Sequence, residues 1–442
     1  MKLPAAFVSQ TQALLGKEWQ AFEKALQAQC PVSIRLNPYK SSEDVLTPFK
    51  PVEMIPWASN AYYLPFRPSF THDPLFHAGC YYVQEASSMF LEQMVGKHIT
   101  QPVKVLDLCA APGGKATQLA SVLPEGSLLV ANEVVRSRAG ILTENIVKWG
   151  TSHTLVTNND PSAVGKCNAF FDVIVADVPC SGEGMFRKDA GAIAEWSVHT
   201  VRLCAERQKR ILADVWQALK PGGLLIYSTC TYNRSENEDI LSWICNELKA
   251  GRVGEPHRFL PHQTKGEGFF IAALRKDESG KTDENNRRND KKTKKSSFPQ
   301  EVKSWLTGGD DFCIFPENNL LKALPSIHSE DYLFLKSRLK ILSAGTFLAE
   351  IKGKELIPAH ALAMSASLDP AAFPRWELDK ETALKYLRRE ALQTNTCDLP
   401  KGYLLVTRHN HPLGFVKNIG VRANNLYPQE WRIRTSGVKA IR

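Results

Sequence analysis

Three segments decide the fold: V-K-V-L-D-L-C-A-A-P-G-G-K at 103–115, D-V-P-C-S-G-E-G at 177–184 and Y-S-T-C-T-Y-N at 227–233. Each begins in or directly follows a short apolar run of the kind that parallel sheets bury on both faces. Strand-like and helix-like runs alternate between them, which predicts right-handed βαβ crossovers. We therefore expect a doubly wound, Rossmann-like α/β sheet that binds its ligand at the carboxyl ends of the strands.

The elements expected around these segments follow in a regular order. Apolar runs predict strands at 103–108, 127–133, 154–157, 171–177, 223–230 and 268–275, and helical periodicity predicts helices at 115–122, 135–149 and 201–219. We expect Pro221-Gly222-Gly223 to stop the last helix, and Ser235 with Glu238 to form a capping box for the next one. The strand ends carry Asp107, Glu133, Asp160, Asp177 and Cys230.

The chain is longer than this core. Its 442 residues exceed one ordinary domain, and 43% hydrophobic residues exclude global disorder. We expect an N-terminal α/β lead-in at 1–100, the core domain at 101–275, a charged linker at 276–298 and a further globular region at 299–442.

Local patterns fill in the two flanking regions. In the lead-in we expect a helix at 11–29, a strand at 33–38, a loop at 48–68 and a strand turning into a helix at 77–89. After the linker we expect short strands at 312–316, 332–335 and 345–351, a helix at 380–392 and β structure at 402–417. Arg35 is either an ordinary structural residue or a phosphate contact.

Composition restricts the partners and the compartment. The net charge of +9 suits a polyanion, although a mildly basic enzyme is equally compatible with it. The ten cysteines show no C-x-x-C spacing, so no zinc site is expected. We read no signal peptide and no membrane-spanning apolar stretch, and therefore expect a cytoplasmic protein with reduced thiols. We also expect a monomer.

Two basic stretches lie outside the core. Four linker lysines (Lys291, Lys292, Lys294 and Lys295) could contact an RNA backbone, although a solvated segment is the better explanation. Near the C-terminus Lys417, Arg422, Arg432, Arg434, Lys439 and Arg442 alternate with Tyr427 and Trp431. Basic and aromatic residues interleaved on small β elements suit an RNA-binding surface, while a purely structural domain remains the alternative.

The loop at 107–114 leads from a strand into a helix. Its glycines let the backbone approach a ligand closely, and the helix N-terminus favours negative charge. It lacks G-x-G-x-x-G, and Lys115 is followed by Ala116 rather than by the hydroxyl residue of a P-loop. A nucleoside cofactor without pyrophosphate fits best, and Glu133 is placed to accept hydrogen bonds from its ribose.

Two cysteines follow neighbouring predicted strands. Cys180 lies after Pro179 and Cys230 after Thr229, and the topology would bring these strand ends together. A thiolate that adds to C6 of cytosine makes C5 nucleophilic, and a second thiol could act as general acid or base. Asp177 could hydrogen-bond the N3 or amino edge of the base. A buried structural thiol is the alternative for any single cysteine.

These motifs resemble the cytosine-C5 RNA methyltransferases of the Nol1/Nop2/Sun family. The resemblance covers about Ser33 to Arg275 and includes S-I-R-L-N, Q-E-A-S-S-M and S-T-C-T-Y-N-R-S-E-N-E besides the segments quoted first. It implies a class I methyltransferase sheet, S-adenosyl-L-methionine as cofactor and RNA as partner. One departure is Val178, where the family usually has alanine.

The resemblance also assigns residues. It implies that Cys230 is the nucleophile and that Cys180 resolves the covalent adduct, with Asp177 as a further catalytic residue. It implies cofactor contacts from Cys109, Ala110, Ala111, Pro112, Gly113, Gly114, Lys115, Glu133, Arg138, Asp160 and Asp177, and no metal.

The C-terminal region resembles one bacterial branch of the same family. The segments at 404–420 and 424–428 are similar to its PUA-like RNA-binding domain, which implies small-subunit ribosomal RNA as the substrate. Four alternatives remain: a transfer RNA cytosine-C5 methyltransferase, a DNA cytosine methyltransferase that attacks through Cys180, an amino-group methyltransferase, and a non-catalytic RNA-binding protein.

Overall fold

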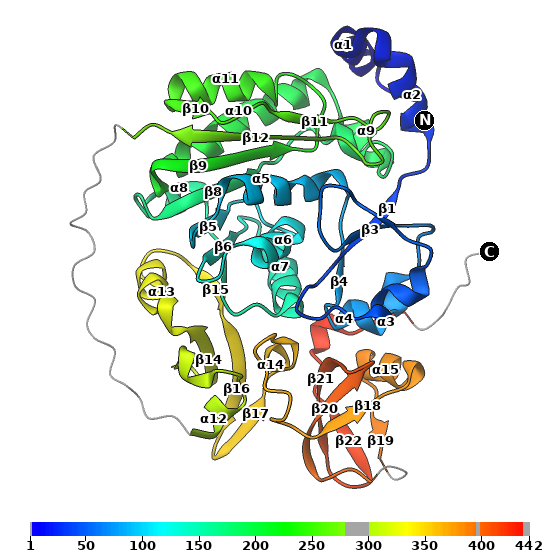
Figure 1. Cartoon of the computed structure of the whole chain (residues 1–442), viewed down its shortest axis with the longest axis vertical. Helices are drawn as coiled ribbons and strands as arrows, with labels where there is room; N and C mark the ends of the chain where they lie inside the picture. Colours follow the sequence, from blue (N-terminus) through cyan, green and yellow to red (C-terminus); the bar gives the residue numbers. More distant parts are fainter. Residues whose placement is uncertain (1, 279–299, 395–397, 436–442) are drawn as a thin grey trace.

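The computed structural model describes residues 2–278, 300–394 and 398–435 (Figure 1). The linker lysines and the end of the basic tail, with Lys439 and Arg442, lie outside the described residues. Four sheets make up the fold, and the largest has nine strands. Within these described ranges, no helix has the length and apolar character needed to cross a membrane.

The nine-stranded sheet confirms the predicted Rossmann-like core. Its order is β10-β12-β9-β8-β5-β6-β7-β15, with β11 (His257–Phe259) paired to β12. The strands β5 to β9 pair in parallel, whereas β12 and β15 join antiparallel. The bounds are β5 (Lys104–Asp107), β6 (Leu128–Asn132), β7 (Thr154–Thr157), β8 (Phe171–Asp177), β9 (Leu219–Thr229), β10 (Ala250–Arg252), β12 (Phe269–Lys276) and β15 (Ile341–Ala344).

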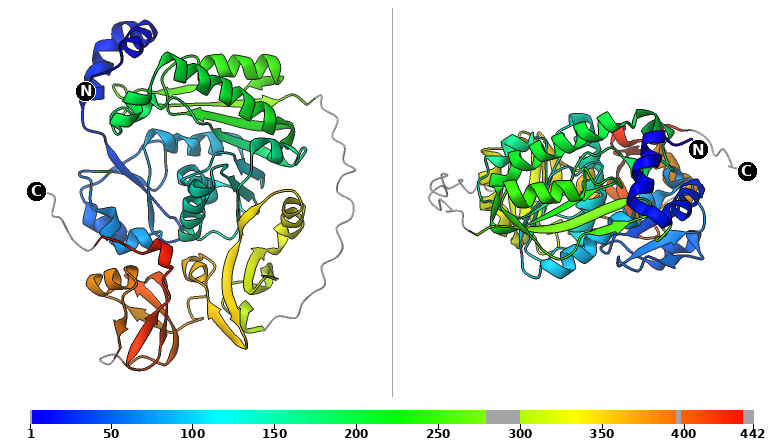
Figure 2. Two further views of the ribbon diagram at one scale, coloured as in Figure 1. Left: turned by 180° about the vertical axis from the view of Figure 1, so that it is seen from behind. Right: turned by 90° about the horizontal axis from the view of Figure 1, so that it is seen from above.

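Alternate side chains of each strand enter different cores, because successive residues point to opposite faces. Leu106 packs with Leu212 of the first face, and Val105 packs with Leu119 of the second. Helices cover both faces (Figure 2). They are α5 (Leu91–His98), α6 (Gly114–Val122) and α7 (Arg136–Trp149) on one side, and α8 (Pro161–Gly165), α10 (Val198–Val215) and α11 (Glu238–Glu247) on the other.

Two local predictions in this core are wrong. The helix α10 ends at Val215, and Pro221-Gly222-Gly223 lies inside β9, where the register to β8 shifts. A bulge absorbs the extra residues, so the turn-forming sequence does not have to end the strand. The capping box is also wrong: Asn237 is the N-cap of α11 without a side-chain cap bond, and Glu238 pairs with Arg258 instead.

The N-terminal region forms a small sheet in the order β2-β3-β1-β4. The predicted first helix is broken at Gly16, and the predicted loop at 48–68 contains two short strands, so both predictions were incomplete. The elements are α1 (Ala5–Leu15), α2 (Trp19–Gln27), β1 (Val32–Leu36), α3 (Glu43–Leu46), β2 (Glu53–Met54), β3 (Ala61–Leu64), α4 (Pro74–His77) and β4 (Tyr81–Val83).

The C-terminal region contains two further sheets, ordered β13-β14-β16-β17 and β18-β20-β21-β22-β19. The predicted strand at 332–335 is helical, because it lies in α13 (Ser329–Lys336). The other elements are α12 (Gln300–Ser304), β13 (Phe312–Glu317), β14 (Leu320–Pro325), β16 (Thr346–Lys352), β17 (Glu355–Pro358), α14 (His360–Met364), β18 (Arg375–Glu377), α15 (Lys380–Leu387), β19 (Leu392–Gln393), β20 (Gly402–Arg408), β21 (His411–Asn418) and β22 (Arg422–Asn425).

The flanking regions share cores with their neighbours. The strand β15 extends the central sheet beside β7, and Leu335 of α13 lies in the core of that sheet. Ile34 of the N-terminal sheet packs in one cluster with Tyr386 and Val416 of the last sheet. The domain boundaries therefore stay a prediction, because the packing crosses the proposed boundary at 299.

Candidate active site

The carboxyl ends of four adjacent strands form the candidate site. The order β6-β5-β8-β9 places the end of β5 at Asp107, the end of β8 at Asp177, and Glu133 and Cys230 directly after β6 and β9. Parallel strands end at the same edge of a sheet, so residues far apart in sequence meet here. Asp160 lies three residues beyond β7, at the next position along this edge.

The two predicted cysteines lie in contact. The sulfurs of Cys180 and Cys230 are 3.2 Å apart, and both side chains are partly buried. The hydrogen bond with the Cys230 sulfur, together with burial, raises the pKa of the Cys180 thiol well above its ordinary value. Two free thiols at strand ends within hydrogen-bonding distance can exchange a proton.

A buried carboxylate that sequence reasoning missed ties the two cysteine loops together. Glu183, three residues after Cys180, is 1% exposed. Its Oε2 accepts hydrogen bonds from the Thr231 hydroxyl at 2.6 Å and from the backbone N–H groups of Tyr232 and Asn233 at 2.7 and 2.9 Å. The loop that carries Cys180 therefore holds the three residues that follow Cys230.

A second missed carboxylate makes the reciprocal contact. Glu236, in the segment after Cys230, is fully buried and accepts the backbone N–H of Ser181 at 2.9 Å. It also accepts from the Gln208 amide at 2.9 Å, and that amide donates to the Pro179 carbonyl at 3.1 Å. Both glutamates lie within the quoted motifs, but nothing in the letters indicated that they are buried.

Asp177 is held in place by two donors. Lys115 Nζ lies 2.8 Å from its Oδ2, and the Ser228 hydroxyl donates to its Oδ1 at 2.7 Å. Asp107 differs, because it is fully buried and neither of its carboxyl oxygens has a hydrogen-bond partner among the residues that the structure describes. Burial, followed by the nearby charge of Asp177, raises the pKa of Asp107 to about 8.

The predicted cofactor loop is shaped by α7. Arg138 donates to the Ala111 carbonyl at 2.8 Å, and Asn145 donates to the Pro112 carbonyl at 2.8 Å. Gly113 has φ of +119°, a backbone conformation that side chains rarely adopt, and Gly114 then begins α6. Two side chains of α7 thus hold the loop, and α6 begins directly after it.

Ala110 and Cys109 belong to the same loop. The Ala110 N–H donates to the Asn132 carbonyl at 2.8 Å, which links the loop to the end of β6. Burial raises the pKa of the Cys109 thiol, so this cysteine is a poor nucleophile.

Glu133 and Asp160 also serve structural roles. Glu133 Oε1 accepts the Val135 N–H at 2.9 Å, while the buried Oε2 has no hydrogen-bond partner and lies 3.6 Å from Arg138. Asp160 caps α8 through Oδ1, and the hydrogen bonds from Ser162 lower its pKa. Among the described residues no hydrogen bond uses Glu133 Oε2, which is ion-paired with Arg138, or Asp160 Oδ2, so both oxygens can accept a hydrogen bond from a ligand.

Arg35 is not a phosphate contact, because it is only 2% exposed. Its guanidinium donates to Gln84 Oε1 at 3.0 Å, to the Thr117 hydroxyl at 2.7 Å and to the Gly114 carbonyl at 3.2 Å. It thereby fastens the N-terminal sheet to the first turn of α6. The alternative that Arg35 is structural is confirmed.

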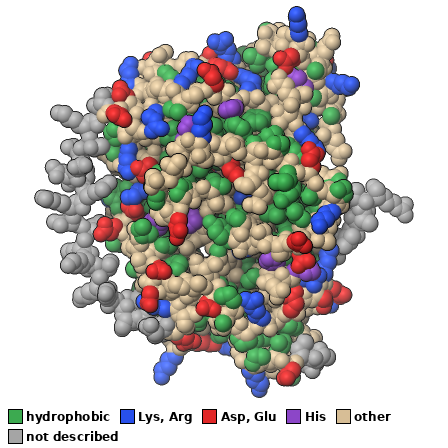
Figure 3. Space-filling model, in the orientation of Figure 1, with side chains coloured by type: hydrophobic (Ala, Val, Ile, Leu, Met, Phe, Trp, Pro, Cys, Tyr) green, Lys and Arg blue, Asp and Glu red, His purple; other side chains and the backbone are tan. Residues whose placement is uncertain are grey.

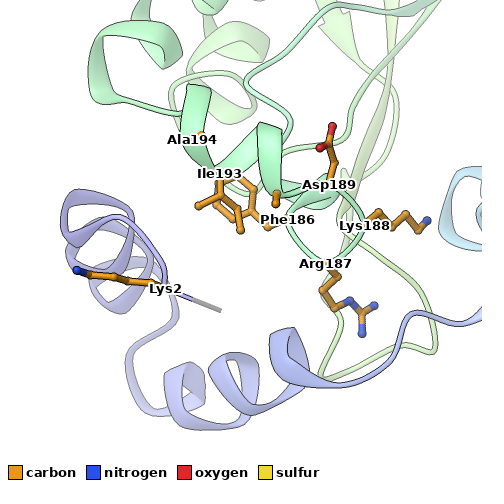
Figure 4. Close-up of a pocket in the computed structure, with 8 residues that line it drawn as sticks. Lys2, Phe186, Arg187, Lys188, Asp189, Ile193 and Ala194 are labelled. Carbon is orange, nitrogen blue, oxygen red and sulfur yellow. The ribbon is translucent and has the colours of Figure 1, made fainter.

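One face of the molecule is mixed in charge. On the face shown in Figure 3, lysine and arginine side chains are spread among acidic ones and do not form one patch. A cavity of about 540 Å³ lies beside α9 (Ala190–Glu195), with Phe186, Lys188 and Ile193 on one side and Lys2 on the other (Figure 4). Most of its lining residues come soon after the Cys180 loop in the sequence, and none of them is a predicted site residue.

Comparison with known proteins identifies the family. The family described as 16S rRNA methyltransferase RsmB/F matches residues 98–275. The N-terminal domain of 16S rRNA methyltransferase RsmF matches 3–86, and the methyltransferase RsmF PUA domain matches 373–433. The ribosomal RNA small subunit methyltransferase F of Erwinia tasmaniensis is 30% identical, over 97% of this chain and 96% of its own length.

The chain belongs to the ribosomal RNA small subunit methyltransferase F family. A second member, from Pectobacterium atrosepticum, is 35% identical over 62% of this chain and 63% of its own. Membership of the RsmF family makes this chain an S-adenosyl-L-methionine-dependent methyltransferase with a C-terminal PUA domain, and confirms the predicted family, cofactor and fold class.

Solved structures agree with this fold. A methyltransferase homologue from Pyrococcus horikoshii is 27% identical, with a TM-score of 0.54 over 61% of this chain and 94% of its own. NSun6 from the same organism, solved with SFG, is 19% identical, with a TM-score of 0.52 over 62% of this chain and 98% of its own. The second likeness shows the fold alone.

The site of this RsmF-family chain fits its cofactor. Both oxygens of Asp107 and the Oε2 of Glu133 are buried acceptors at two adjacent strand ends, without a hydrogen-bond donor in the described part of the chain. The loop between them has a positive-φ glycine. The ammonium group and ribose hydroxyls of S-adenosylmethionine are donors of the kind that such acceptors need.

Proposed function

We propose that this protein methylates carbon 5 of a cytosine in small-subunit ribosomal RNA through a covalent cysteine adduct. The observation that carries the proposal is the contact of two free thiols, Cys180 and Cys230, beside Asp177 at adjacent strand ends. Addition to C6 requires one thiolate, and breakdown of the adduct requires a second group that moves a proton.

In the proposed reaction Cys230 is the nucleophile. Its sulfur bonds to C6, and the electron pair of the C5–C6 double bond moves to C5. Asp177, already held by Lys115 and Ser228, faces the edge of the base that gains charge during this addition. The bound cofactor supplies the methyl group that C5 takes up.

Cys180 takes part in the second half. After methyl transfer, solvent water accepts the C5 proton, the C5–H electron pair re-forms the C5–C6 double bond, and the C6–sulfur bond breaks with its electrons on the Cys230 sulfur; solvent returns a proton to Cys180 at the end of the cycle. The raised pKa of Cys180 keeps this residue a thiol, which can return a proton to the departing Cys230 sulfur 3.2 Å away.

The proposed cofactor contacts divide into three groups. The loop between β5 and α6, with the start of α6, supplies Cys109, Ala110, Ala111, Pro112, Gly113, Gly114 and Lys115. Glu133 and Asp160 each offer a carboxylate oxygen, and Arg138 and Asp177 border the loop. We assign the methionine end to the loop near Asp107, the ribose to Glu133 and the base to Asp160.

Three observations support ribosomal RNA as the substrate. The relatives are named for acting on small-subunit ribosomal RNA, residues 373–433 match a PUA domain, and the chain carries a net charge of +9. We propose that the protein acts in the cytoplasm and as a monomer.

Transfer of a labelled methyl group tests the proposal. Purified protein would be incubated with labelled S-adenosylmethionine and small-subunit RNA, assembled small subunits or transfer RNA, and the product nucleosides separated. We expect label in 5-methylcytidine from ribosomal RNA. Label in N4-methylcytidine, or in transfer RNA alone, would refute the proposal.

A further inference from the structure

Two buried carboxylates hold the cysteine loops together, because each loop carries a glutamate that binds the other loop. We propose that Glu183 and Glu236 are positioning residues that fix the distance between the Cys180 and Cys230 sulfurs. The catalytic meaning of this distance rests on the proposed function, whereas the positioning itself concerns the protein alone. Neither glutamate touches the base or the cofactor in the proposed mechanism.

The hydrogen bonds of both glutamates end next to the cysteines. Glu183 binds the Thr231 side chain and the next two backbone N–H groups, directly after Cys230. Glu236 binds the N–H of Ser181, directly after Cys180. Each cysteine is therefore followed by a backbone segment that is held by a carboxylate from the opposite loop.

Further hydrogen bonds connect the same two loops. The Asn233 amide donates to Glu183 Oε1 at 3.1 Å and to Glu236 Oε1 at 2.7 Å, so it bridges the two carboxylates. The N–H of Gly184 donates to the Cys230 carbonyl at 2.9 Å, and a Cβ added at Gly184 would lie 2.9 Å from that oxygen. The loops thus approach each other too closely for a side chain at position 184.

Neutral donors alone surround these acids. Within the part of the chain that the structure describes, neither Glu183 nor Glu236 takes part in an ion pair. Trp196 adds a hydrogen bond from its indole N–H to Glu183 Oε1 at 2.9 Å. A buried carboxylate needs such donors. Five of them belong to the two cysteine loops, namely the Thr231 hydroxyl, the Asn233 amide and the N–H groups of Ser181, Tyr232 and Asn233.

A side-chain amide cannot replace either acid. Glu183 and Glu236 each accept hydrogen bonds on both oxygens, so the NH₂ group of glutamine would face a donor at one of them. One loop would then move away from the other. Thr231 offers a milder change, because Thr231→Val removes a single hydroxyl without changing the shape of the side chain, and Thr231→Ser keeps the hydroxyl.

The test measures how well the two sulfurs meet, without any RNA. Oxidised glutathione accepts two electrons from the thiols of Cys180 and Cys230, which form a disulfide and release two molecules of reduced glutathione. Sulfurs 3.2 Å apart must approach to about 2.05 Å, so the equilibrium reports their effective concentration. Peptide mass spectrometry identifies the Cys180–Cys230 bond, and Cys180→Ala provides the blank.

We expect Glu183→Gln, Glu236→Gln and Thr231→Val each to lower the effective concentration by at least about tenfold, with kcat reduced and the KM for RNA unchanged. Thr231→Ser should restore the value to within about twofold, and Asp172→Asn at the far end of β8 should leave it unchanged. An unchanged value in Thr231→Val and in a folded glutamate variant would overturn the proposal. If the parent protein makes no 5-methylcytidine but the variants still lose thiol proximity, the proposed function fails and the positioning stands.

Discussion

Asp107→Asn should stabilise the cofactor-free protein at neutral pH. Asp107 is the fully buried last residue of β5, and its two oxygens have no hydrogen-bond partner within residues 2–278, 300–394 and 398–435. Burial, together with the charge of Asp177, raises its pKa from 3.8 to about 8. Between these two values the folded chain keeps a proton that the unfolded chain releases. The free energy of unfolding therefore falls as the pH rises through this interval.

The magnitude follows from the size of the pKa difference. Each unit of difference corresponds to about 1.4 kcal/mol, so at pH 7 Asp107 lowers the stability by about 4 kcal/mol, an order-of-magnitude figure. At pH 4.5 the same group lowers it by at most about 1 kcal/mol. Asparagine does not ionise, and its amide has almost the same shape as the carboxyl group. The substitution therefore removes the pH-dependent contribution of this residue to the free energy of unfolding.

Urea unfolding at pH 4.5, 6 and 7.5 measures this effect. Asp107→Asn should be more stable than the parent at pH 7.5, and the two should converge at pH 4.5, while Asp172→Asn should not show this pattern. With saturating S-adenosylmethionine the parent should instead be more stable than Asp107→Asn, because the ammonium group of the cofactor stabilises the ionised carboxylate. A variant that is less stable than the parent at pH 7.5 without cofactor would refute the reasoning.

Two further changes test other parts of the account. Lys115→Met removes the cation 2.8 Å from Asp177, so kcat for methyl transfer should fall by about 100-fold, whereas Lys104→Met, at the opposite end of β5, should keep its kcat; equal kcat values in both variants would contradict the assigned role. Leu335→Ala should lower the free energy of unfolding of the whole protein by about 2–5 kcal/mol in urea, because Leu335 is fully buried in the core of the central sheet. A separate, early transition of the C-terminal region alone would show that α13 is not part of this core.

The parallel core was predictable because each strand is a short apolar run that ends at a polar residue. Leu106 and Ile174, for example, are both fully buried, as runs without alternation indicate. The errors arose where tertiary contacts override local preference. Pro221 and Gly222 look like a helix stop followed by a turn, yet a bulge places them inside β9. The apolar run at 332–335 looks like a strand, but its helix packs against the central sheet.

The parts of the candidate site that depend on a reactive residue type, such as cysteine, were predictable from the sequence. The contact of Cys180 and Cys230 followed from topology, since adjacent parallel strands end at the same edge. Glu183 and Glu236 were missed because an acidic residue in a loop normally lies in solvent. Their burial depends on backbone N–H groups of the opposite loop. Almost every residue type has such a group, so the sequence does not show which of them will bind a carboxylate.

The covalent adduct tests the central claim most directly. Cys180→Ala, mixed with small-subunit RNA and S-adenosylmethionine, should accumulate a protein–RNA complex that survives denaturation, because the Cys230 sulfur cannot leave. Cys230→Ala and the double variant should form no complex and should not methylate RNA. A complex that forms in Cys230→Ala and is absent in Cys180→Ala would contradict the assignment of the two thiols.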